Sequence, residues 1–422
     1  MAATDKRCAF CKRPSNECKR LVGNPEGPWI CERCTDAASE TIVELQKEST
    51  TKKDEKPLLK PREIKAHLDE HVIGQEKAKQ DVAVAVYNHY KRRECLKKGM
   101  KFDCEIRKSN ILLLGPSGSG KTEIARAITK MLGVPFYNAD ATKMTQAGYV
   151  GDDVESMIQG LLQDGGGDLE RAQWGVIFLD EVDKLARKSG RGASGYRDVT
   201  GEGVQQALLK MIEGTKVRVP RGSARMVGSG GQDVDVVDTE NVLFICAGSF
   251  AGIEEVVQKR INKDVRLGFG SAARKDVDDT QTYLAVEEED ILEFGIIPEL
   301  LGRLPVHTTT LPLTEDEMVR ILTEPKSAIV KQFKAMFQMD GIDLQFDTDA
   351  LKAIGREAKK RPTGARALRS IMEKILRPYS YDYPSEDEVS AVRITEDVVL
   401  GKGEAIVVRE GKKKPEPSVM QG

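Results

Sequence analysis

Eight consecutive residues, from Gly115 to Thr122, have the types and the spacing that hold a triphosphate. The stretch Gly-Pro-Ser-Gly-Ser-Gly-Lys-Thr matches the pattern G-x-x-x-x-G-K-S/T at every fixed position. In this pattern glycines let backbone N–H groups close around phosphate oxygens, the lysine reaches the β- and γ-phosphates, and the last hydroxyl binds Mg²⁺. We therefore expect a site for ATP and Mg²⁺, with Lys121 in a catalytic role, at Gly115, Pro116, Ser117, Gly118, Ser119, Gly120, Lys121 and Thr122.

Two adjacent carboxylates, Asp180 and Glu181, follow the apolar run Val-Ile-Phe-Leu, which begins after Gly175. At the end of a strand beside a phosphate-binding loop, Asp180 would hold Mg²⁺ through its water shell. Glu181 would then polarise the water that attacks the γ-phosphate. Both are expected to be catalytic, and the alternative is the ordinary exposed end of a surface strand.

Four of the eight cysteines form two C-x-x-C pairs, Cys8 with Cys11 and Cys31 with Cys34, and 19 residues separate the pairs. This spacing is typical of a four-thiolate zinc site, because each pair chelates from one tight turn and soft thiolates suit Zn²⁺. The alternatives are two disulfides or a redox motif. The remaining cysteines lie outside the pattern and are expected to be buried or simply exposed: Cys18, Cys95, Cys104 and Cys246.

The composition restricts the class of protein. A chain of 422 residues with a formal net charge of -2 is expected to form soluble domains without a general attraction for nucleic acid or anionic lipid. No apolar run approaches the ~20 residues that span a bilayer, and the first residues lack the apolar core of a signal peptide. We therefore expect a cytoplasmic protein whose cysteines are thiols or metal ligands.

Short buried strands must position the phosphate-binding loop and the carboxylates. Continuous apolar runs bounded by turn signals predict strands at 111–114, 135–140, 175–181 and 241–249. Strands that alternate with helices predict an α/β fold in which helices flank a parallel sheet on both faces. The stretches 187–200 and 218–238 are rich in Gly, Ser and charged residues and are expected to be exposed loops.

An apolar pair, Val72 and Ile73, precedes Gly74 and lies between two expected helices, the second beginning at about Glu76. Ahead of a phosphate-binding loop, such a pair is expected to contact the adenine ring of the nucleotide. Ordinary core packing is an alternative of equal weight.

Changes in composition divide the chain into five parts. Residues 1–48 would be a zinc module, 49–61 a flexible polar linker, 62–311 a large ATPase domain, 312–409 a smaller, mostly helical α+β domain, and 410–422 a disordered tail. A capping box from Thr314 to Glu317 is expected to open the smaller domain.

Several ordered motifs together resemble the AAA+ ATPases of the Clp unfoldase group, over about Cys8 to Val408. They are the phosphate-binding loop, Leu-Asp-Glu ending at Glu181, the four-cysteine module, a Gly-Tyr-Val-Gly loop, Ile-Pro-Glu-Leu-Leu-Gly-Arg ending at Arg303 and Gly-Ala-Arg from Gly364 to Arg366. The resemblance implies a hexameric ring with ATP between subunits. It also implies that Arg303 is a catalytic arginine finger acting on the neighbouring subunit, and that Arg366 is a second sensor on the phosphates of its own chain.

The resemblance further implies two contacts with other proteins. Tyr149 and Val150 match the loop that grips substrate polypeptide in the axial pore. Leu267, Gly268 and Phe269 lie where the group docks on the ClpP peptidase.

Two features depart from the group or are weakly defined in the sequence. Between Arg218 and Met226 the chain keeps three arginines but lacks the histidine of the usual pore-entrance loop, so the preferred substrate tag is not implied. Ser249 is a candidate for the polar first sensor.

The expected function is ATP-driven unfolding of tagged or adaptor-delivered proteins, which are passed to ClpP. The expected partners are further copies of the chain, ClpP, substrates and adaptor proteins, with neither membrane nor nucleic acid. One alternative is a DNA-remodelling ATPase whose zinc module grips nucleic acid; near-neutral charge and an aromatic pore loop weigh against it. A switch-like ATPase without processive work is a third interpretation, and the hydrolysis set weighs against it. No protease chemistry of the chain's own is expected.

Overall fold

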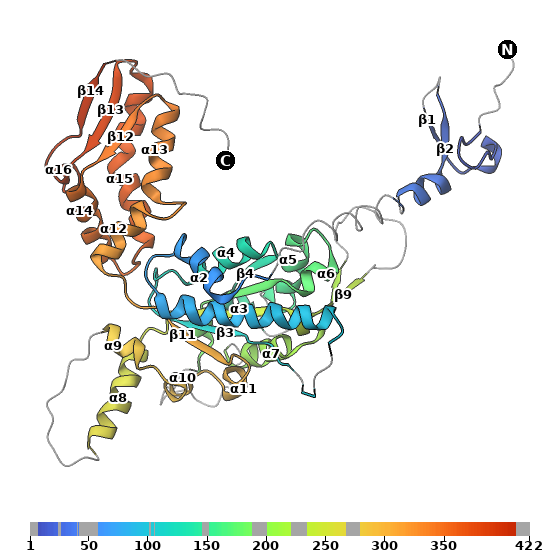
Figure 1. Ribbon diagram of the computed structural model, residues 1–422, viewed down its shortest axis with the longest axis horizontal. Coiled ribbons are helices and arrows are strands. Elements are labelled where there is room, and N and C mark those ends of the chain that lie inside the picture. Colours follow the sequence, from blue (N-terminus) through green and yellow to red (C-terminus); the bar gives the residue numbers. More distant parts are fainter. Residues whose placement is uncertain are drawn as a thin grey trace. The chain divides into compact units, whose positions relative to one another are not determined.

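The structure, a computed structural model, describes residues 7–23, 27–39, 41, 58–100, 103–104, 106–145, 152–187, 201–220, 234–266 and 279–410. The chain divides into two compact units, Met1–Leu58 and Leu59–Gly422. The second unit contains a large domain built on a parallel sheet and a smaller α+β domain that follows it (Figure 1). Most of the expected linker, 49–57, and residues 411–422 of the expected tail lie outside the described residues.

The first unit has little regular structure. A 3-10 turn, η1 (Ser15–Glu17), precedes β1 (Leu21–Gly23), which pairs antiparallel with β2 (Trp29–Cys31). Residues 32–39 are helical. Among its described residues, Cys8 and Cys31 are the buried ones, so this part of the unit has no apolar core of ordinary size.

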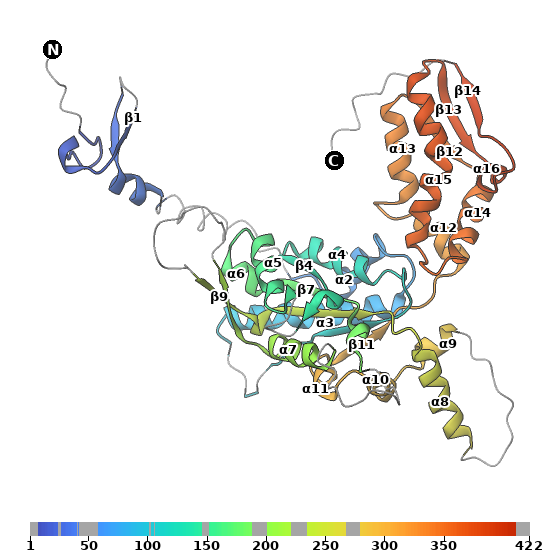
Figure 2. The ribbon, with the colours of Figure 1, turned by 180° about the vertical axis from the view of Figure 1, so that it is seen from behind.

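Five parallel strands form the centre of the large domain, in the order β11 (Val306–Thr309), β3 (Ile111–Leu114), β10 (Leu243–Gly248), β7 (Val176–Asp180) and β4 (Phe136–Asp140). Every residue of β3 and β10 is buried. Parallel strands are covered by helices on both faces and therefore read as continuous apolar runs. The predicted parallel sheet flanked by helices is confirmed, and Figure 2 shows it from behind.

The helices of the large domain connect these strands. α3 (Glu76–Lys97) packs on β11 and β3, α4 (Lys121–Leu132) on β7 and β10, and α5 (Ser156–Asp164) on β4. The other elements of this domain are α2 (Pro61–Asp69), η2 (Ala141–Lys143), β5 (Met144–Thr145), β6 (Asp152–Asp153), α6 (Leu169–Gln173), η3 (Val182–Leu185), α7 (Glu202–Glu213), β8 (Lys216–Pro220), β9 (Val234–Asp238), η4 (Thr239–Asn241), α8 (Ile253–Arg266), α9 (Asp279–Leu284), α10 (Glu288–Phe294) and α11 (Pro298–Leu301).

The expected loop at 218–238 is wrong at both of its ends, because β8 and β9 pair there as an antiparallel hairpin. Along β8, buried Val217 and Val219 alternate with exposed Lys216 and Arg218, which is the period of a half-buried strand. The Gly- and Ser-rich residues that follow obscure this short alternation in the sequence. Residues 221–233 between the strands lie outside the described residues, as do 188–200.

The smaller domain has a core of its own. α12 (Glu315–Thr323) begins at the predicted capping box, in which Thr314 and Glu317 bond to each other's backbone N–H groups. Buried Leu322, Phe333 and Ile354 belong to this core. The remaining elements are α13 (Ile329–Met339), β12 (Asp343–Phe346), α14 (Thr348–Lys359), α15 (Arg366–Asp382), η5 (Tyr383–Ser385), β13 (Val389–Ile394), α16 (Glu396–Val399) and β14 (Ile406–Arg409), with strand order β12-β13-β14. In the described part of the chain, no helix is long and apolar enough to cross a membrane.

The placement of β10 at the centre of the sheet leads to a stability prediction. Phe244 is 0% exposed there, so Phe244→Ala should leave a cavity and lower the free energy of unfolding by about 3–5 kcal/mol. Urea unfolding followed by the fluorescence of Trp174 in the same domain measures the loss. The control, Leu284→Ala, removes a half-exposed side chain and should change stability by no more than about 0.5 kcal/mol. Equal losses in the two variants would contradict this core assignment.

Candidate functional site

The loop from Gly115 to Gly120 joins the end of β3 to the first residue of α4, so its backbone N–H groups lie at a helix N-terminus. Gly115 has φ +141°, and a Cβ there would lie 2.2 Å from the carbonyl oxygen of Thr310. Only glycine fits so close to a neighbouring strand in that conformation. The geometry is therefore that of a compact anion cradle.

Lys121 lies inside this cradle. Its Nζ donates to the carbonyl oxygens of Gly115, at 2.6 Å, and Pro116, at 2.9 Å. Burial lowers the pKa of Lys121 to about 8, and the nearby Asp180 carboxylate opposes that effect. The group is consequently still mainly cationic at pH 7, and its charge lies where phosphate oxygens would bind.

Oxygen donors from two elements meet beside the cradle. The Thr122 hydroxyl lies 3.5 Å from Oδ2 of Asp180, the last residue of β7. Hydroxyl and carboxylate oxygens are the hard ligands that suit Mg²⁺, which also keeps several waters. These residues therefore fit the expected metal site.

Glu181 follows at once in a left-handed conformation, with φ +59° and ψ +31°. Its N–H donates to Oδ1 of Asp180 at 2.9 Å, and the residue is exposed. A non-glycine residue held this way costs of order 1–3 kcal/mol, and such strain is concentrated at functional sites. Asp180 thus lies beside Thr122 of the cradle, whereas Glu181 is exposed.

The segment between α2 and α3 borders the same loop. Val72 and Ile73 are each 5% exposed, and Cγ1 of Val72 lies 3.5 Å from the Cβ position of Gly120. The side-chain amide of Gln75 donates to the carbonyl oxygen of Leu311 at 2.9 Å and accepts from its N–H at 2.7 Å. The segment from Val72 to Gln75 is thus bonded to the chain that leads into the smaller domain.

The smaller domain also touches the cradle. A Cβ on Gly118 would lie 2.3 Å from the carbonyl oxygen of Thr363, and one on Gly364 would lie 2.8 Å from that of Ser117. Arg366, the first residue of α15, places Nη2 4.0 Å from Oδ2 of Asp180. The structure therefore brings Arg366 together with the phosphate-binding loop.

Arg303 lies elsewhere. It follows α11, and its Nε donates to Oε1 of Glu213 on α7 at 2.8 Å, with both side chains nearly half exposed. No recorded contact within the described residues joins it to the cradle of its own chain. Unlike Arg366, which lies beside the cradle, Arg303 has a guanidinium that is accessible to solvent on the surface of the large domain.

Three hydrogen-bonded contacts near the cradle escaped sequence reasoning, although Ser249 and Ser119, which take part in two of them, are candidate site residues. Ser249 follows β10, and Asp183, which is buried, accepts from its N–H and its hydroxyl, both at 3.1 Å. The hydroxyls of Ser119 and Thr310 share a hydrogen bond of 2.7 Å. Gln75 is the third. Asp183 carried a weak signal, a third acidic residue just after Asp180 and Glu181, and Ser119 belongs to the phosphate-binding loop, whereas Thr310 and Gln75 lie in no recognisable motif.

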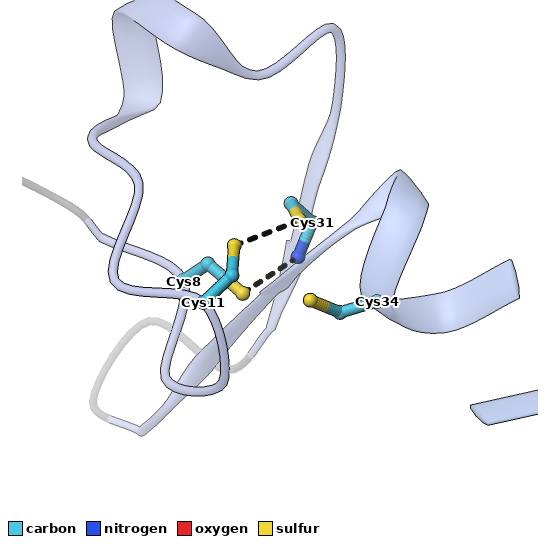
Figure 3. A group of neighbouring side chains, drawn as sticks. All are labelled: Cys8, Cys11, Cys31 and Cys34. Carbon is cyan, nitrogen blue, oxygen red and sulfur yellow. Dashed lines mark hydrogen bonds between the residues drawn. The ribbon is translucent and has the colours of Figure 1, made fainter. Parts of the chain in front are cut away.

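Four cysteine thiols lie close together in the N-terminal unit. The sulfur atoms of Cys8, Cys11, Cys31 and Cys34 all lie within 4.8 Å of one another, and none of the four is in a disulfide (Figure 3). The Cys31 N–H donates to Sγ of Cys8 at 3.3 Å, and the sulfurs of Cys11 and Cys31 are 3.5 Å apart. A hydrogen bond from the Cys11 N–H lowers the pKa of Cys8 to about 6, and desolvation raises that of Cys34 to about 12. A bound dication would favour the thiolate form of all four cysteines and offset two of their four negative charges, so the donor set fits Zn²⁺.

Two expected sites lie outside the described residues: Tyr149 and Val150 of the pore loop, and Leu267, Gly268 and Phe269 of the docking tripeptide. Of the three arginines expected at a pore entrance, Arg218 is described and is exposed on β8.

Comparison with known proteins gives three family matches. Residues 106–307 match the AAA domain (Cdc48 subfamily), residues 313–396 the C-terminal, D2-small domain of ClpB protein, and residues 6–44 the ClpX C4-type zinc finger. Several relatives are similar over most of their length and are described as the ATP-dependent Clp protease ATP-binding subunit ClpX. The Treponema denticola protein is 46% identical over 90% of both chains. The Borrelia duttonii protein is 41% identical over 97% of this chain and 94% of its own, and a Methylococcus capsulatus protein, ClpX 3, is 43% identical over 96% and 95%.

The thiol quartet leads to a metal-removal prediction. Because the first unit has little apolar core, Zn²⁺ should supply most of its folding free energy. Cys31→Ser should abolish binding of the one Zn²⁺ per chain and expose the backbone N–H groups of residues 7–39 to hydrogen exchange, while the large domain keeps its protection. Metal analysis and exchange mass spectrometry measure both. Cys104→Ser, an exposed thiol outside the quartet, is the matched control. A zinc-loaded Cys31→Ser chain would overturn the assignment.

Proposed function

Because the chain belongs to the ClpX family of AAA+ ATPases, we propose that it unfolds and translocates proteins as a hexameric ring and delivers them to the ClpP peptidase. The observation that carries this proposal is the similarity to ClpX relatives along nearly the whole chain, from the thiol quartet to the smaller domain. The chain is an ATPase that uses ATP with Mg²⁺ and holds Zn²⁺. We further propose that it works in the cytoplasm, with the five parts 1–48, 49–61, 62–311, 312–409 and 410–422 as its domains, linker and tail.

In the proposed hydrolysis reaction, the cradle and Lys121 bind the β- and γ-phosphates. When Lys121 turns from the carbonyl oxygens of Gly115 and Pro116 to the phosphates, it exchanges neutral acceptors for charged ones, and charge-assisted hydrogen bonds are the stronger kind. Thr122 and Asp180 would hold Mg²⁺, which would neutralise charge on the phosphates when bound. Glu181, the next residue, which is held in a left-handed backbone conformation, accepts a proton from the attacking water.

Two arginines would complete the site from opposite directions. Arg366 reaches the phosphates of its own chain, as its 4.0 Å approach to Asp180 supports. Arg303, paired with exposed Glu213, is free to leave that weak surface ion pair and bind the γ-phosphate of a neighbouring subunit. A fixed planar guanidinium suits both roles. Hydrolysis would thus need both the smaller domain and a second copy of the chain.

Movement of the smaller domain would follow nucleotide binding. The recorded contacts of this domain with the large domain include Thr363 on Gly118, Gly364 on Ser117, and Lys326 on Glu70, whose Nζ and Oε2 are 2.7 Å apart. These contacts border the cradle and the Val72–Ile73 segment. A nucleotide that fills the cradle therefore changes the surface on which the smaller domain rests.

The substrate contacts of the proposal rest on the family. Tyr149 and Val150 would grip an extended polypeptide in the pore, and Leu267, Gly268 and Phe269 would insert into a pocket of ClpP. Protein substrates, adaptors, ClpP and further copies of the chain are the proposed partners, with neither membrane nor nucleic acid among them.

Glu181 allows a sharp test of the hydrolysis site. Glu181→Gln keeps the size of the side chain but removes the base, so ATP hydrolysis should fall about 10²–10⁴-fold with little change in ATP affinity. Steady-state hydrolysis and binding of a fluorescent ATP analogue separate the two effects. Glu202→Gln, a surface carboxylate paired with Arg187, is the control. Retained hydrolysis in Glu181→Gln would remove Glu181 from the mechanism.

Tyr149 tests the proposed function itself. Tyr149→Ala should hydrolyse ATP yet fail to unfold a stably folded, C-terminally tagged fluorescent protein, because the ring that contacts polypeptide is missing. Tyr149→Phe keeps the ring and should retain unfolding. Fluorescence loss and ATP hydrolysis are recorded in the same tube. Hydrolysis without unfolding by the wild-type chain, together with stimulation by DNA, would instead favour a DNA-remodelling ATPase.

A further inference from the structure

A fifth thiol lies beside the zinc quartet. The Cys18 sulfur, the Cys31 sulfur and a carboxylate oxygen of Glu32 lie within 4.8 Å of one another. Cys31 therefore belongs to two overlapping clusters, the quartet and this second one. Cys18 is half-buried and is not part of a C-x-x-C pair.

Backbone contacts hold Cys18 in this place independently of the quartet. The Glu32 carboxylate accepts from the N–H groups of Lys19, at 3.2 Å, and Arg20, at 3.1 Å. The Glu32 N–H in turn donates to the carbonyl oxygen of Arg20 at 3.3 Å. Leu21 then pairs with Cys31 in the β1–β2 ladder. The segment that carries Cys18 is thus bonded directly to the segment that carries Cys31 and Glu32.

Coordination chemistry leaves this thiol without a role in the metal site. Structural Zn²⁺ takes four protein ligands in a tetrahedron, and the quartet supplies all four. Cys18 would therefore remain an uncoordinated thiol next to a coordinated one. A resolving cysteine is a thiol that condenses with an oxidised neighbouring sulfur to form a disulfide. Cys18, next to Cys31, meets this requirement.

We propose that Cys18 is a resolving thiol that converts peroxide oxidation of Cys31 into a Cys18–Cys31 disulfide and thereby releases zinc. Hydrogen peroxide oxidises the Cys31 thiolate to a sulfenic acid as its O–O bond breaks, and with one proton the other oxygen leaves as water. The Cys18 sulfur then attacks the Cys31 sulfur, the S–S bond forms, and the sulfenic oxygen leaves as a second water with the Cys18 proton. Each cysteine sulfur loses one electron, and the peroxide gains two.

The consequence would be loss of the fold of the N-terminal unit under oxidising conditions. The disulfide removes Cys31 from the metal, and three remaining thiolates bind Zn²⁺ more weakly. Because the unit depends on the metal for folding, zinc release and unfolding should coincide. A thiol reductant with added Zn²⁺ should reverse both.

The test uses the zinc-loaded full chain treated with hydrogen peroxide. A chromogenic chelator follows zinc, and alkylation followed by mass spectrometry maps the disulfides. The wild type should form the Cys18–Cys31 bond and release about one Zn²⁺ per chain, whereas Cys18→Ser should release zinc at least about tenfold more slowly because no resolving thiol is present. Cys104→Ser should behave like the wild type.

Two results would overturn the proposal. If Cys18→Ser releases zinc at the wild-type rate with a Cys11–Cys31 disulfide, the quartet resolves its own oxidation, since those two sulfurs are already 3.5 Å apart. If unoxidised Cys18→Ser holds less zinc than the wild type, Cys18 is a ligand rather than a resolving thiol. Neither readout involves ATP or substrate, so both outcomes are independent of the proposed unfoldase activity.

Discussion

Parallel pairing of five strands is the constraint on which the nucleotide site depends. Because all five strands run in one direction, their carboxyl ends meet at one edge of the sheet. The phosphate-binding loop follows β3, Asp180 ends β7, Ser249 follows β10, and Thr310 follows β11. The cradle is therefore assembled from four segments whose shared position is fixed by the buried apolar strands.

Much of this arrangement could be predicted because it is local in the sequence. β3 and β10 are buried throughout, β7 is a buried apolar run up to Asp180, and the phosphate-binding loop and the C-x-x-C pairs have fixed spacings. β11 was missed because Val-His-Thr-Thr is only partly apolar; it is an edge strand beside β3 whose Thr308 bonds to Asp81 of α3. The β8–β9 hairpin was missed because glycines and serines dominate its surroundings.

The contacts that escaped prediction join residues far apart in the chain. Ser119 and Thr310 are 191 positions apart, and Gln75 and Leu311 are 236 apart. Each is a single polar pair, and a single Ser, Thr or Gln has many alternative partners until the fold brings one to it. Arg303 and Arg366 show a related limit: their motifs are similarly clear, yet only the fold shows that Arg366 lies beside Asp180 at the cradle whereas Arg303 pairs with Glu213 on α7.

α15 runs for 17 residues through the smaller domain and begins beside the cradle. At ~1.5 Å per residue the helix is about 25 Å long, and its first residue, Arg366, lies beside Asp180 while its last, Asp382, lies far from the nucleotide. A tilt of about 10° at the Arg366 end would displace the other end by roughly 4 Å over that length. Because α15 begins beside Asp180, any change in its direction there is multiplied along its length, and Pro378 inside the helix is the one position where it can bend without losing a backbone hydrogen bond of its own N–H.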